Sequence, residues 1–276
     1  MQQIAHLSPQ LQTFAADVIR LCAWLVILAA IFIPAERFWP PDPRPVGRKS
    51  LASDLVYYFL SGFLPKMLLA VPIATVAAVI HLVIPGGFYA RAALLPVWFR
   101  IAAGMVVGEI GTYWGHRWSH EIPFLWRFHS LHHSAEEVDW LVNTRAHPLD
   151  MFFTRFCGLV PMYVLGLAQP MGNRLDLVPV LVTLVGTMWG FFIHANVSWR
   201  FGPLEWLVAT PAFHHWHHTN EAPETLDKNY AALLPWVDKL FGTFHLPDRL
   251  PRKYGTDTPV PAGVVDQIFE PILPHK

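Results

Sequence analysis

The sequence predicts an all-α integral membrane protein with about four to six transmembrane or half-membrane helices. Charged residues make up 14% of the 276-residue chain, well below the roughly 25% of an ordinary soluble domain. Apolar stretches recur that are close to the roughly 20 residues a helix needs to cross a bilayer. Histidines gather at the predicted ends of these stretches. The composition therefore predicts a membrane protein, and the histidines predict a polar site at one face of it.

Charge and cysteine content exclude several other classes. The 20 basic and 20 acidic residues leave a formal net charge of zero, whereas a nucleic-acid binder needs a clustered excess of Lys and Arg. The two cysteines, Cys22 and Cys157, lie in apolar runs without CxxC spacing. The sequence therefore encodes neither a disulfide framework, a thiolate zinc site nor an iron–sulfur cluster.

Five apolar segments are the candidate spans. The first, at residues 14–33, lacks the basic start and small-residue cleavage site of a signal peptide, so we expect it to be retained. Residues 54–84 carry Pro65 and Pro72, which predict one kinked span or two half-helices. Residues 92–114 lead into the first histidine motif. The last two segments predict a helical hairpin closed by QPMGNR, and they cover residues 149–168 and 175–197.

Basic residues between the first two segments predict the orientation. PAERFWPPDPRPVGRKS holds Arg37, Arg44, Arg48 and Lys49, whereas the N-terminal tail has neither Lys nor Arg. By the positive-inside rule this loop is cytoplasmic and the N-terminus lies outside. Following the later spans from there puts residues 116–147 and the whole C-terminal part in the cytoplasm. Every dense histidine cluster is then predicted on the cytoplasmic side.

The histidines are clustered along the chain. Eleven of the 15 fall between residues 116 and 218, in HRWSH, HSLHH, RAHP, FIHAN and HHWHH. Positions i, i+3 and i+4 of a helix share one face, so three of these motifs project imidazoles side by side. Imidazole binds iron, zinc, copper and nickel, and one ion takes about four to six donors. About ten ligands exceed the needs of one ion, so the count predicts two metals.

A purely structural role is the alternative. For His6, His81, His245 and His275, which stand alone, an ordinary hydrogen-bonded side chain is the favoured interpretation. Several imidazoles packed together in a low-dielectric site would leave polar nitrogens and potential like charges uncompensated. A metal supplies that compensation, so we interpret the clusters as ligands.

The order of the motifs resembles the fatty acid hydroxylase superfamily, the membrane-bound histidine-rich di-iron family that includes sterol C5-desaturases, C4-methylsterol oxidases, fatty acid 2-hydroxylases and alkylglycerol monooxygenase. The motifs are HxxxH at 116–120, HxxHH at 129–133, HP at 147–148, FxHxN at 192–196 and HxxHH at 214–218. The segment DKNYAALLPWVDKLFGTF resembles the closing block of that family. The resemblance divides the chain into N-terminal helices with a basic loop (1–94), a catalytic domain (95–250) and a C-terminal tail (251–276).

The resemblance implies a four-helix membrane core under a histidine-rich cytosolic helical cap, with a dinuclear iron centre where the two meet. The metal ligands carried over are His116, His120, His129, His132, His133, His147, His194, His214, His217 and His218. Of these, His147 and His194 stand singly, where the acyl hydroxylase branch pairs histidines in its third motif. His215 points to another side of its helix, so we expect it to support a ligand or face the substrate.

The chemistry implied by the resemblance is O2-dependent oxidation of a lipid C–H bond by two irons, giving an alcohol or an alkene. The sequence does not separate hydroxylation from desaturation. It holds no flavin, nicotinamide or heme fingerprint, so electrons are expected from a separate reductase, ferredoxin or cytochrome-type donor. The substrate is expected from the bilayer, as a sterol, acyl chain or ether lipid. The segment HSAEEVDWLVNTRAHP looks closer to the sterol desaturase and alkylglycerol monooxygenase branches.

Other polar residues are candidates for supporting the metals. Asn143, Arg145 and Asn196 stand beside single histidines, where they could orient a ligand or bind a head group. Glu109 lies within a predicted span, two turns before the first histidine motif, and is expected to line the route to the metals, bond a ligand or bond a neighbouring helix. Acidic side chains that could accept an imidazole N–H, or simply face solvent, are Glu136, Glu137 and Asp139. Asp227 and Asn229 are expected to fix the cap.

Two other functions remain open from the sequence. A histidine-rich metal transporter or sensor would place its ligands along a path within the spans, whereas these lie at the helix ends and beyond. A membrane zinc hydrolase would be supported by HExxH, but HRWSH lacks the glutamate.

Overall fold

The structure is a computed structural model that describes residues 8–41, 50–168 and 177–273. The QPMGNR turn, the basic residues Arg44, Arg48 and Lys49, and the isolated His6 and His275 lie outside the described residues. The longer helices are α1 (Pro9–Phe38), α2 (Leu51–Val83), α4 (Val97–Glu121), α6 (Pro148–Val164) and α7 (Leu177–His194). The shorter α-helices are α3 (Gly86–Ala93), α5 (Pro123–His133), α8 (Pro211–His217), α9 (Trp236–Phe241) and α10 (Val264–Phe269). Four 3₁₀ helices complete the described elements: η2 (Trp140–Thr144), η3 (Gly202–Trp206), η4 (Pro223–Thr225) and η5 (Glu270–Ile272).

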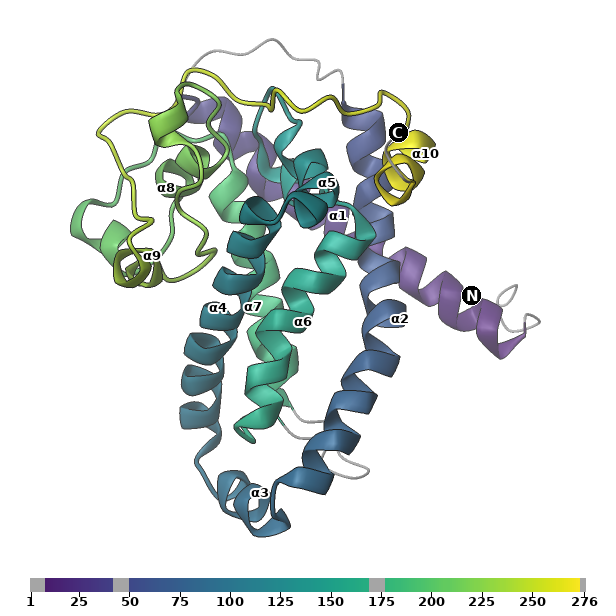
Figure 1. Ribbon diagram of the computed structural model, residues 1–276. Helices are drawn as coiled ribbons and strands as arrows, with labels where there is room; N and C mark the ends of the chain where they lie inside the picture. The colour runs from purple at the N-terminus through teal and green to yellow at the C-terminus, as the bar shows by residue number, and fades with distance from the viewer. Residues whose placement is uncertain (1–7, 42–49, 169–176, 274–276) are drawn as a thin grey trace.

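The long helices form a bundle with a cap at one end (Figure 1). Helices α2 and α6 begin at the cap, while α4 and α7 end there, and α3 lies at the opposite end. The cap consists of α5, η2 and the segments that carry α8, α9 and α10. Helix α1 crosses the bundle obliquely in Figure 1. It is bonded to α2, because the Tyr58 hydroxyl of α2 donates a 2.8 Å hydrogen bond to the Leu21 carbonyl of α1.

Three helices, α1, α2 and α7, are long and apolar enough to cross a membrane, and α3 with α4 makes a fourth if this bent pair is one span. The protein is therefore an all-α membrane protein, as predicted, at the lower end of the predicted number of spans. Helix α2 is continuous, which settles the choice between one span and two half-helices. The segment predicted as a span at 92–114 contains a 115° bend between α3 and α4, because Pro96 caps a new helix.

Glycines bring α4 and α6 into close contact. A Cβ atom placed on Gly111 would fall against the carbonyl group of Cys157, and one placed on Gly115 would meet the Cys157 side chain. Gly158 of α6 in turn faces the side chain of Thr112. Small residues allow helix backbones to approach closely within a membrane, where van der Waals packing replaces the hydrophobic effect between helices. This contact fixes the end of α4, which carries the first histidine motif, against the start of α6.

The last two predicted spans run antiparallel, as in the predicted hairpin, but their main packing partners are other elements. Helix α6 packs mainly against α4 and α2, whereas α7 packs against α4, η2 and α8. Between α6 and α7 the bundle instead encloses part of a cavity of about 1050 Å³. The described parts of the predicted cytoplasmic segments lie at the capped end, since the start of α2, the end of α4 and the end of α7 meet there.

Candidate metal centre

The ends of four helices converge on the histidines. His116 and His120 lie on the last two turns of α4, and the HSLHH motif ends α5. His194 is the last residue of α7, and the HHWHH motif forms α8 with His218 as its C-cap. Helix α8 begins at Pro211, and the side chain of Thr210 caps it by accepting the N–H of Phe213. The sequence thus ends each helix where its imidazoles can face the others.

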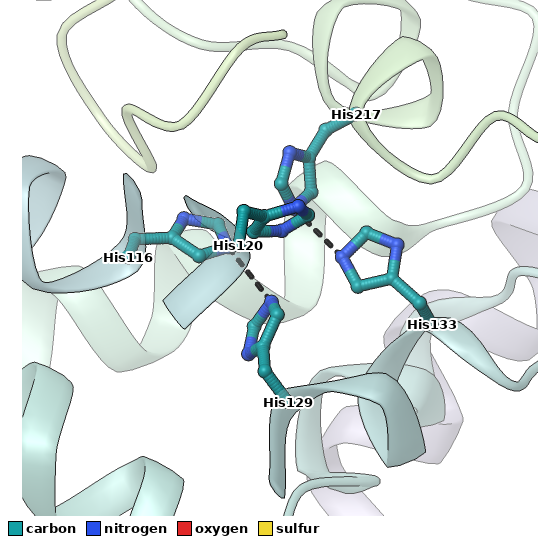
Figure 2. Close-up of side chains that lie close together, drawn as sticks. All are labelled: His116, His120, His129, His133 and His217. Atoms are coloured by element: carbon teal, nitrogen blue, oxygen red, sulfur yellow. Dashed lines mark hydrogen bonds between the residues drawn. The ribbon is translucent and has the colours of Figure 1, made fainter. Parts of the chain in front are cut away.

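The structure gathers nine of the ten predicted ligands into two groups. The five-histidine group consists of His116, His120, His129, His133 and His217, and the four-histidine group consists of His132, His194, His214 and His218. Within each group one nitrogen from every side chain lies within 4.8 Å of the others. Figure 2 shows the five-histidine group, whose side chains point from separate segments toward a common centre. The groups are adjacent, because the rings of His133 and His218 stack with centroids 4.6 Å apart.

Each HxxHH motif contributes to both groups. In HSLHH, His129 and His133 belong to the five-histidine group and His132 to the other. In HHWHH, His214 and His218 belong to the four-histidine group and His217 to the other. Side chains at i and i+4 therefore share one centre, and the side chain at i+3 reaches the neighbouring one. Helices α5 and α8, which have this spacing, contribute to both groups, and α4 and α7 supply the remaining histidines.

Hydrogen bonds to Nδ1 fix the tautomers in the five-histidine group. His116 Nδ1 lies 2.7 Å from the Tyr230 carbonyl oxygen, and His217 Nδ1 lies 2.8 Å from that of Lys228. A carbonyl oxygen only accepts hydrogen bonds, so both Nδ1 atoms carry the proton. His129 Nδ1 donates in the same way to the Asp150 carboxylate at 3.0 Å. Their Nε2 atoms are left with lone pairs that point into the group.

The four-histidine group follows the same rule in part. His132 Nδ1 donates to the Arg145 carbonyl at 3.1 Å, and His194 Nδ1 donates to the Gly190 carbonyl at 2.7 Å. The Nδ1 atoms of His214 and His218 are buried and have no hydrogen-bond partner among the described residues. Two of the four tautomers are therefore fixed by the protein.

These tautomers make both groups incomplete without a cation. His116 Nε2 lies 3.2 Å from His129 Nε2, and His132 Nε2 lies 3.3 Å from His194 Nε2. Because the proton of each ring sits on Nδ1, each of these contacts brings two lone pairs together and cannot be a hydrogen bond. A metal ion between the nitrogens turns both repulsive contacts into coordination. Each group contains one such contact. The residues therefore fit two metal ions, one in each group.

Three histidines of the two groups, His132, His133 and His217, are held neutral. Burial, with the neighbouring imidazoles, lowers the pKa of His132 to about 3. The same causes lower the pKa values of His133 and His217 well below the ordinary histidine value. A neutral imidazole is the form that binds metal, so these sites are ready for an ion at neutral pH.

Two carboxylates support the five-histidine group. Asp150, in the first turn of α6, accepts from His129 through Oδ2 and from the Ser119 hydroxyl through Oδ1. Asp227 accepts a hydrogen bond from His120 Nδ1 at 3.0 Å. The backbone of Asp227 is in the left-handed region, with a φ of 56°. Carboxylates behind ligating imidazoles fix ring orientation and raise ligand basicity. Asp150 was not predicted for this role, although an acid two residues after the HP motif, at the start of a predicted span, was the available signal. Asp227 was predicted only to fix the cap.

The carboxylates predicted for that role lie elsewhere. The Asp139 side chain accepts the N–H of Leu141 and caps η2, while Glu136 and Glu137 are exposed. Asn229 does fix the cap, as predicted, because its amide donates to the Phe213 and His245 carbonyls and accepts the N–H of His245.

His147 and His215 lie outside both groups. His147 caps α6, since its Nδ1 accepts the N–H of Leu149 and its Nε2 donates to the Ile268 carbonyl. Both ring nitrogens are thus engaged, and the structure does not bring His147 to a metal group. His215 is fully buried, with Nδ1 2.8 Å from the Tyr254 hydroxyl and Nε2 3.2 Å from the Ala195 carbonyl. His215 thus contacts the backbone that follows His194. It points away from the two groups, as expected because it lies on a different side of its helix.

The other predicted polar residues brace the site. Arg145 forms a buried ion pair with Asp54 at 2.8 Å and donates to the Ser134 hydroxyl, so it joins α2 to the end of α5. Asn143 lies against Gly190, whose carbonyl accepts from His194, and it also lines the cavity. The N–H of Asn196 donates to the carboxylate of Glu36 in α1.

Glu109 bonds to a loop of the cap, and the predicted bond to a ligand or to a neighbouring helix is not found among the described residues. Its place on a route to the metals stays a prediction. Its Oε1 accepts the N–H groups of Leu233 and Leu234, which ties α4 to the cap. The same residue lines the cavity, together with Asn143, Met151 and Phe191 near the capped end. The cavity therefore runs from the apolar bundle to residues that contact or adjoin the histidine groups.

The fold and the site define a membrane protein with two adjacent groups of histidines that could hold metal, at the capped end of a helix bundle that contains an apolar cavity. Comparison with known proteins identifies the family: residues 101–243 match the model of the fatty acid hydroxylase family, which is about half of the chain. The chain belongs to this family. The predicted resemblance is thereby confirmed.

Several curated proteins are similar to the chain. It is 37% identical over 181 residues to the ornithine lipid hydroxylase OlsE of Rhizobium tropici, covering 64% of this chain and 51% of that protein. It is 30% identical over 176 residues to the alkylglycerol monooxygenase of Homo sapiens, covering 63% and 35%. It is 26% identical over 162 residues to the very-long-chain aldehyde decarbonylase GL1-7 of Oryza sativa subsp. japonica, covering 54% and 25%. The match thus spans about half of the length of the first of these relatives and less of the other two. No solved structure matches it.

Proposed function

We propose that this protein is a membrane di-iron oxygenase that uses O2 to hydroxylate or desaturate a C–H bond of a lipid. The observation that carries the proposal is the pair of adjacent histidine groups, each with a contact between two Nε2 lone pairs that only a cation can satisfy. Imidazole also binds zinc and copper. Iron is favoured because the chain belongs to the fatty acid hydroxylase family and similar proteins are named as hydroxylases and monooxygenases.

Nine histidines are the proposed ligands, and His147 is left out of the set because both of its ring nitrogens are bonded to backbone groups. When bound, two reduced irons supply the electrons and the open coordination positions at which O2 is activated for hydrogen-atom removal. The protein's own part is to hold the Nε2 atoms in place through hydrogen bonds from Nδ1. Asp150 holds a negative charge beside His129 and so favours a positively charged centre.

The cavity supports a lipid as substrate. It lies within the bundle, and its lining near the capped end includes Met151, Phe191 and Leu233. Apolar walls of this kind bind a hydrocarbon chain and exclude water from the reacting carbon. Two similar proteins are named for lipid substrates, an ornithine lipid and an alkylglycerol. A lipid that enters the cavity from the bilayer fits both observations.

The reaction needs two electrons and two protons from outside the substrate. Hydroxylation consumes one O2, two electrons and two protons, and it gives the alcohol and one water. Desaturation consumes the same reagents and gives the alkene and two waters. The chain carries no flavin, nicotinamide or heme fingerprint, so we propose a separate ferredoxin, reductase or cytochrome-type protein as the donor. The histidine groups and the C-terminal part are proposed to face the cytoplasm, and the N-terminus the outside, on the charge asymmetry of the sequence.

Turnover by the purified protein tests the proposal. The full chain in detergent would be loaded with iron and supplied with O2, a ferredoxin and its reductase, and an alkylglycerol or an ornithine lipid. We expect O2 consumption and a product that has gained one oxygen atom or lost two hydrogens. His217→Ala should abolish this product, whereas His81→Ala, at the far end of α2, should not. Lipid cleavage without O2 consumption would instead support a hydrolase, and metal exchange without product would support a transport protein.

A further inference from the structure

Arg155 is a charged side chain on the wall of the cavity within the bundle. It lies on α6, is half-buried and lines the cavity together with residues of α1, α2, α4 and α7. Helix α6 rises about 1.5 Å per residue, which places Arg155 about 8 Å farther from the cap than Asp150. Arg155 therefore lies about one to two helical turns from the level of the histidine groups, on the side of the apolar bundle.

The faces of α6 explain why this side chain points into the cavity. Asp150 bonds to Ser119 of α4, and Cys157 contacts Gly111 and Gly115 of α4, so these positions mark the face packed on that helix. Met151, Arg155, Leu159 and Met162 line the cavity. Their spacing of three or four residues forms one continuous stripe on a helix. Arg155 is the charged member of that stripe.

Arg155 has no partner within the described part of the chain, since no hydrogen bond, ion pair or ring contact involves it there. Other arginines of the bundle are anchored. Arg100 donates to the Leu167 carbonyl at 2.9 Å, and Arg145 pairs with Asp54 at 2.8 Å. A charged group in a membrane interior is costly unless it is paired or hydrated. The guanidinium groups of Arg100 and Arg145 are satisfied by acceptors of the protein, whereas that of Arg155 faces the cavity.

We propose that Arg155 binds an anionic group of the lipid substrate, a carboxylate or a phosphate, inside the cavity. This inference rests on the proposed function, because it assigns a substrate class to the same cavity. A guanidinium offers several N–H donors in a plane that match two oxygens of either anion. The partner missing from the protein is then supplied by the lipid.

The position of Arg155 also limits where the lipid is oxidised. The distance of about 8 Å between the levels of Arg155 and Asp150 is far shorter than an extended acyl chain. An anion held at Arg155 therefore leaves only a short length of lipid to reach from its polar group to the histidine centre. The oxidised carbon is accordingly expected close to the anionic group.

Equilibrium binding to the full chain in detergent tests the assignment without any turnover. The probes are radiolabelled hexadecanoate, hexadecyl phosphate and hexadecan-1-ol, at a pH where both acids are ionised. The wild-type protein should bind at least one of the two anions about tenfold more tightly than the alcohol, because a charge-assisted hydrogen bond is worth at least that factor. The better of the two anions identifies the group that the site is built for.

Three variants connect the preference to this residue. Arg155→Met should remove the tenfold preference, and Arg155→Lys should keep part of it, since it retains the charge without the planar pair of donors. Lys253→Met, an exposed cation outside the cavity, is the matched control and should bind as the wild type does. A wild-type protein that binds alcohol and anions equally, or an Arg155→Met protein that keeps the preference, would overturn the proposal.

Stability separates a ligand-binding arginine from a structural one. Removing an unpaired charge from an apolar cavity should leave the thermal midpoint of the lipid-free protein unchanged or higher. A lower midpoint for Arg155→Met would indicate a structural role instead. The binding measurement is also independent of the proposed oxidation, since it needs no iron. Anion preference without turnover would refute the oxygenase, whereas turnover without anion preference would refute the role of Arg155 alone.

Discussion

The two histidine groups are neighbours, but the protein supports them differently. The five-histidine group is backed by two carboxylates, and one of these, Asp227, has a side chain that is 64% exposed. The four-histidine group has backbone carbonyls behind two of its rings, and it lies at the end of α7, where Asn143 contacts Gly190 beside the cavity. Negative charge behind a ligand strengthens metal binding. In the proposed dinuclear centre, the five-histidine group is therefore expected to hold its metal more tightly, while the four-histidine group adjoins the cavity through Asn143.

Removing a ligand from either group should have the largest effect. Partners behind a ligand are worth about 10- to 100-fold in metal affinity or activity, so loss of a ligand itself, in His132→Ala or His217→Ala, should cost at least about a hundredfold in turnover. Product formation and metal content per chain would be measured on the purified variants. We expect the four-histidine metal to be lost in the first variant and the five-histidine metal in the second. Full turnover in either variant, with its metal retained, would refute the ligand assignment.

The carboxylates should sharpen the difference between the groups. Asp150→Asn keeps the shape of a buried side chain but removes its charge from His129, and we expect metal affinity at the five-histidine group to fall about 10- to 100-fold. Asp227→Asn should have a smaller effect, because its exposed charge is screened by water. Competition with a coloured chelator would measure both affinities. An equal loss in the two variants would mean that exposure does not weaken the support from Asp227.

Acid should destabilise the metal-free protein. The pKa of His132 is about 3 in the folded chain and about 6.5 when unfolded. Between these values the unfolded chain binds the extra proton, so stability is lost as the pH falls below about 6.5, by up to about 1.4 kcal/mol per pH unit for each such histidine. The thermal midpoint in detergent should therefore drop between about pH 7.5 and about pH 5.5.

The same acid titration on metal-loaded protein is its control. A bound ion competes with protons for the Nε2 atoms, so the loaded protein should keep its midpoint to a lower pH. A metal-free protein with an unchanged midpoint over this range would contradict the buried, neutral state of these histidines.

The smallest effect on metal content is expected at His147, and this variant tests whether His147 is a metal ligand. His147→Ala removes the side-chain cap of α6 and should cost about 1 kcal/mol of stability, seen as a lower thermal midpoint. Metal content should stay at the wild-type value, because His147 bonds to Leu149 and Ile268 instead of to a metal. Loss of a metal ion in this variant would show that His147 is a ligand after all.

The sequence predicted the residues of the centre better than their arrangement. Helical spacing correctly indicated that His116 and His120 share a face, because 3.6 residues per turn is a local property. It did not show that His132 separates from His129 and His133, since that division depends on which helices oppose α5. Asp227 reaches His120 through a left-handed backbone, which is a tertiary detail without a sequence signature of its own.

The spans show the same limit. The apolar segments predicted the helices, yet the bend at Pro96 and the separation of α6 from α7 were missed. Hydrophobicity indicates that a helix is membrane-embedded but not which neighbour it packs against. The glycines of α4 allow close packing against α6. This packing leaves room for the cavity beside α6.

Iron content and spin coupling test the central claim most directly. The full chain would be purified without oxygen in detergent, loaded with iron-57, and examined for metal per chain and by Mössbauer spectroscopy. The account predicts two irons per chain in a coupled pair, with one remaining in His132→Ala and one in His217→Ala, in distinct environments. One iron or none in folded wild-type protein would contradict the dinuclear centre, and with it the proposed oxygenase.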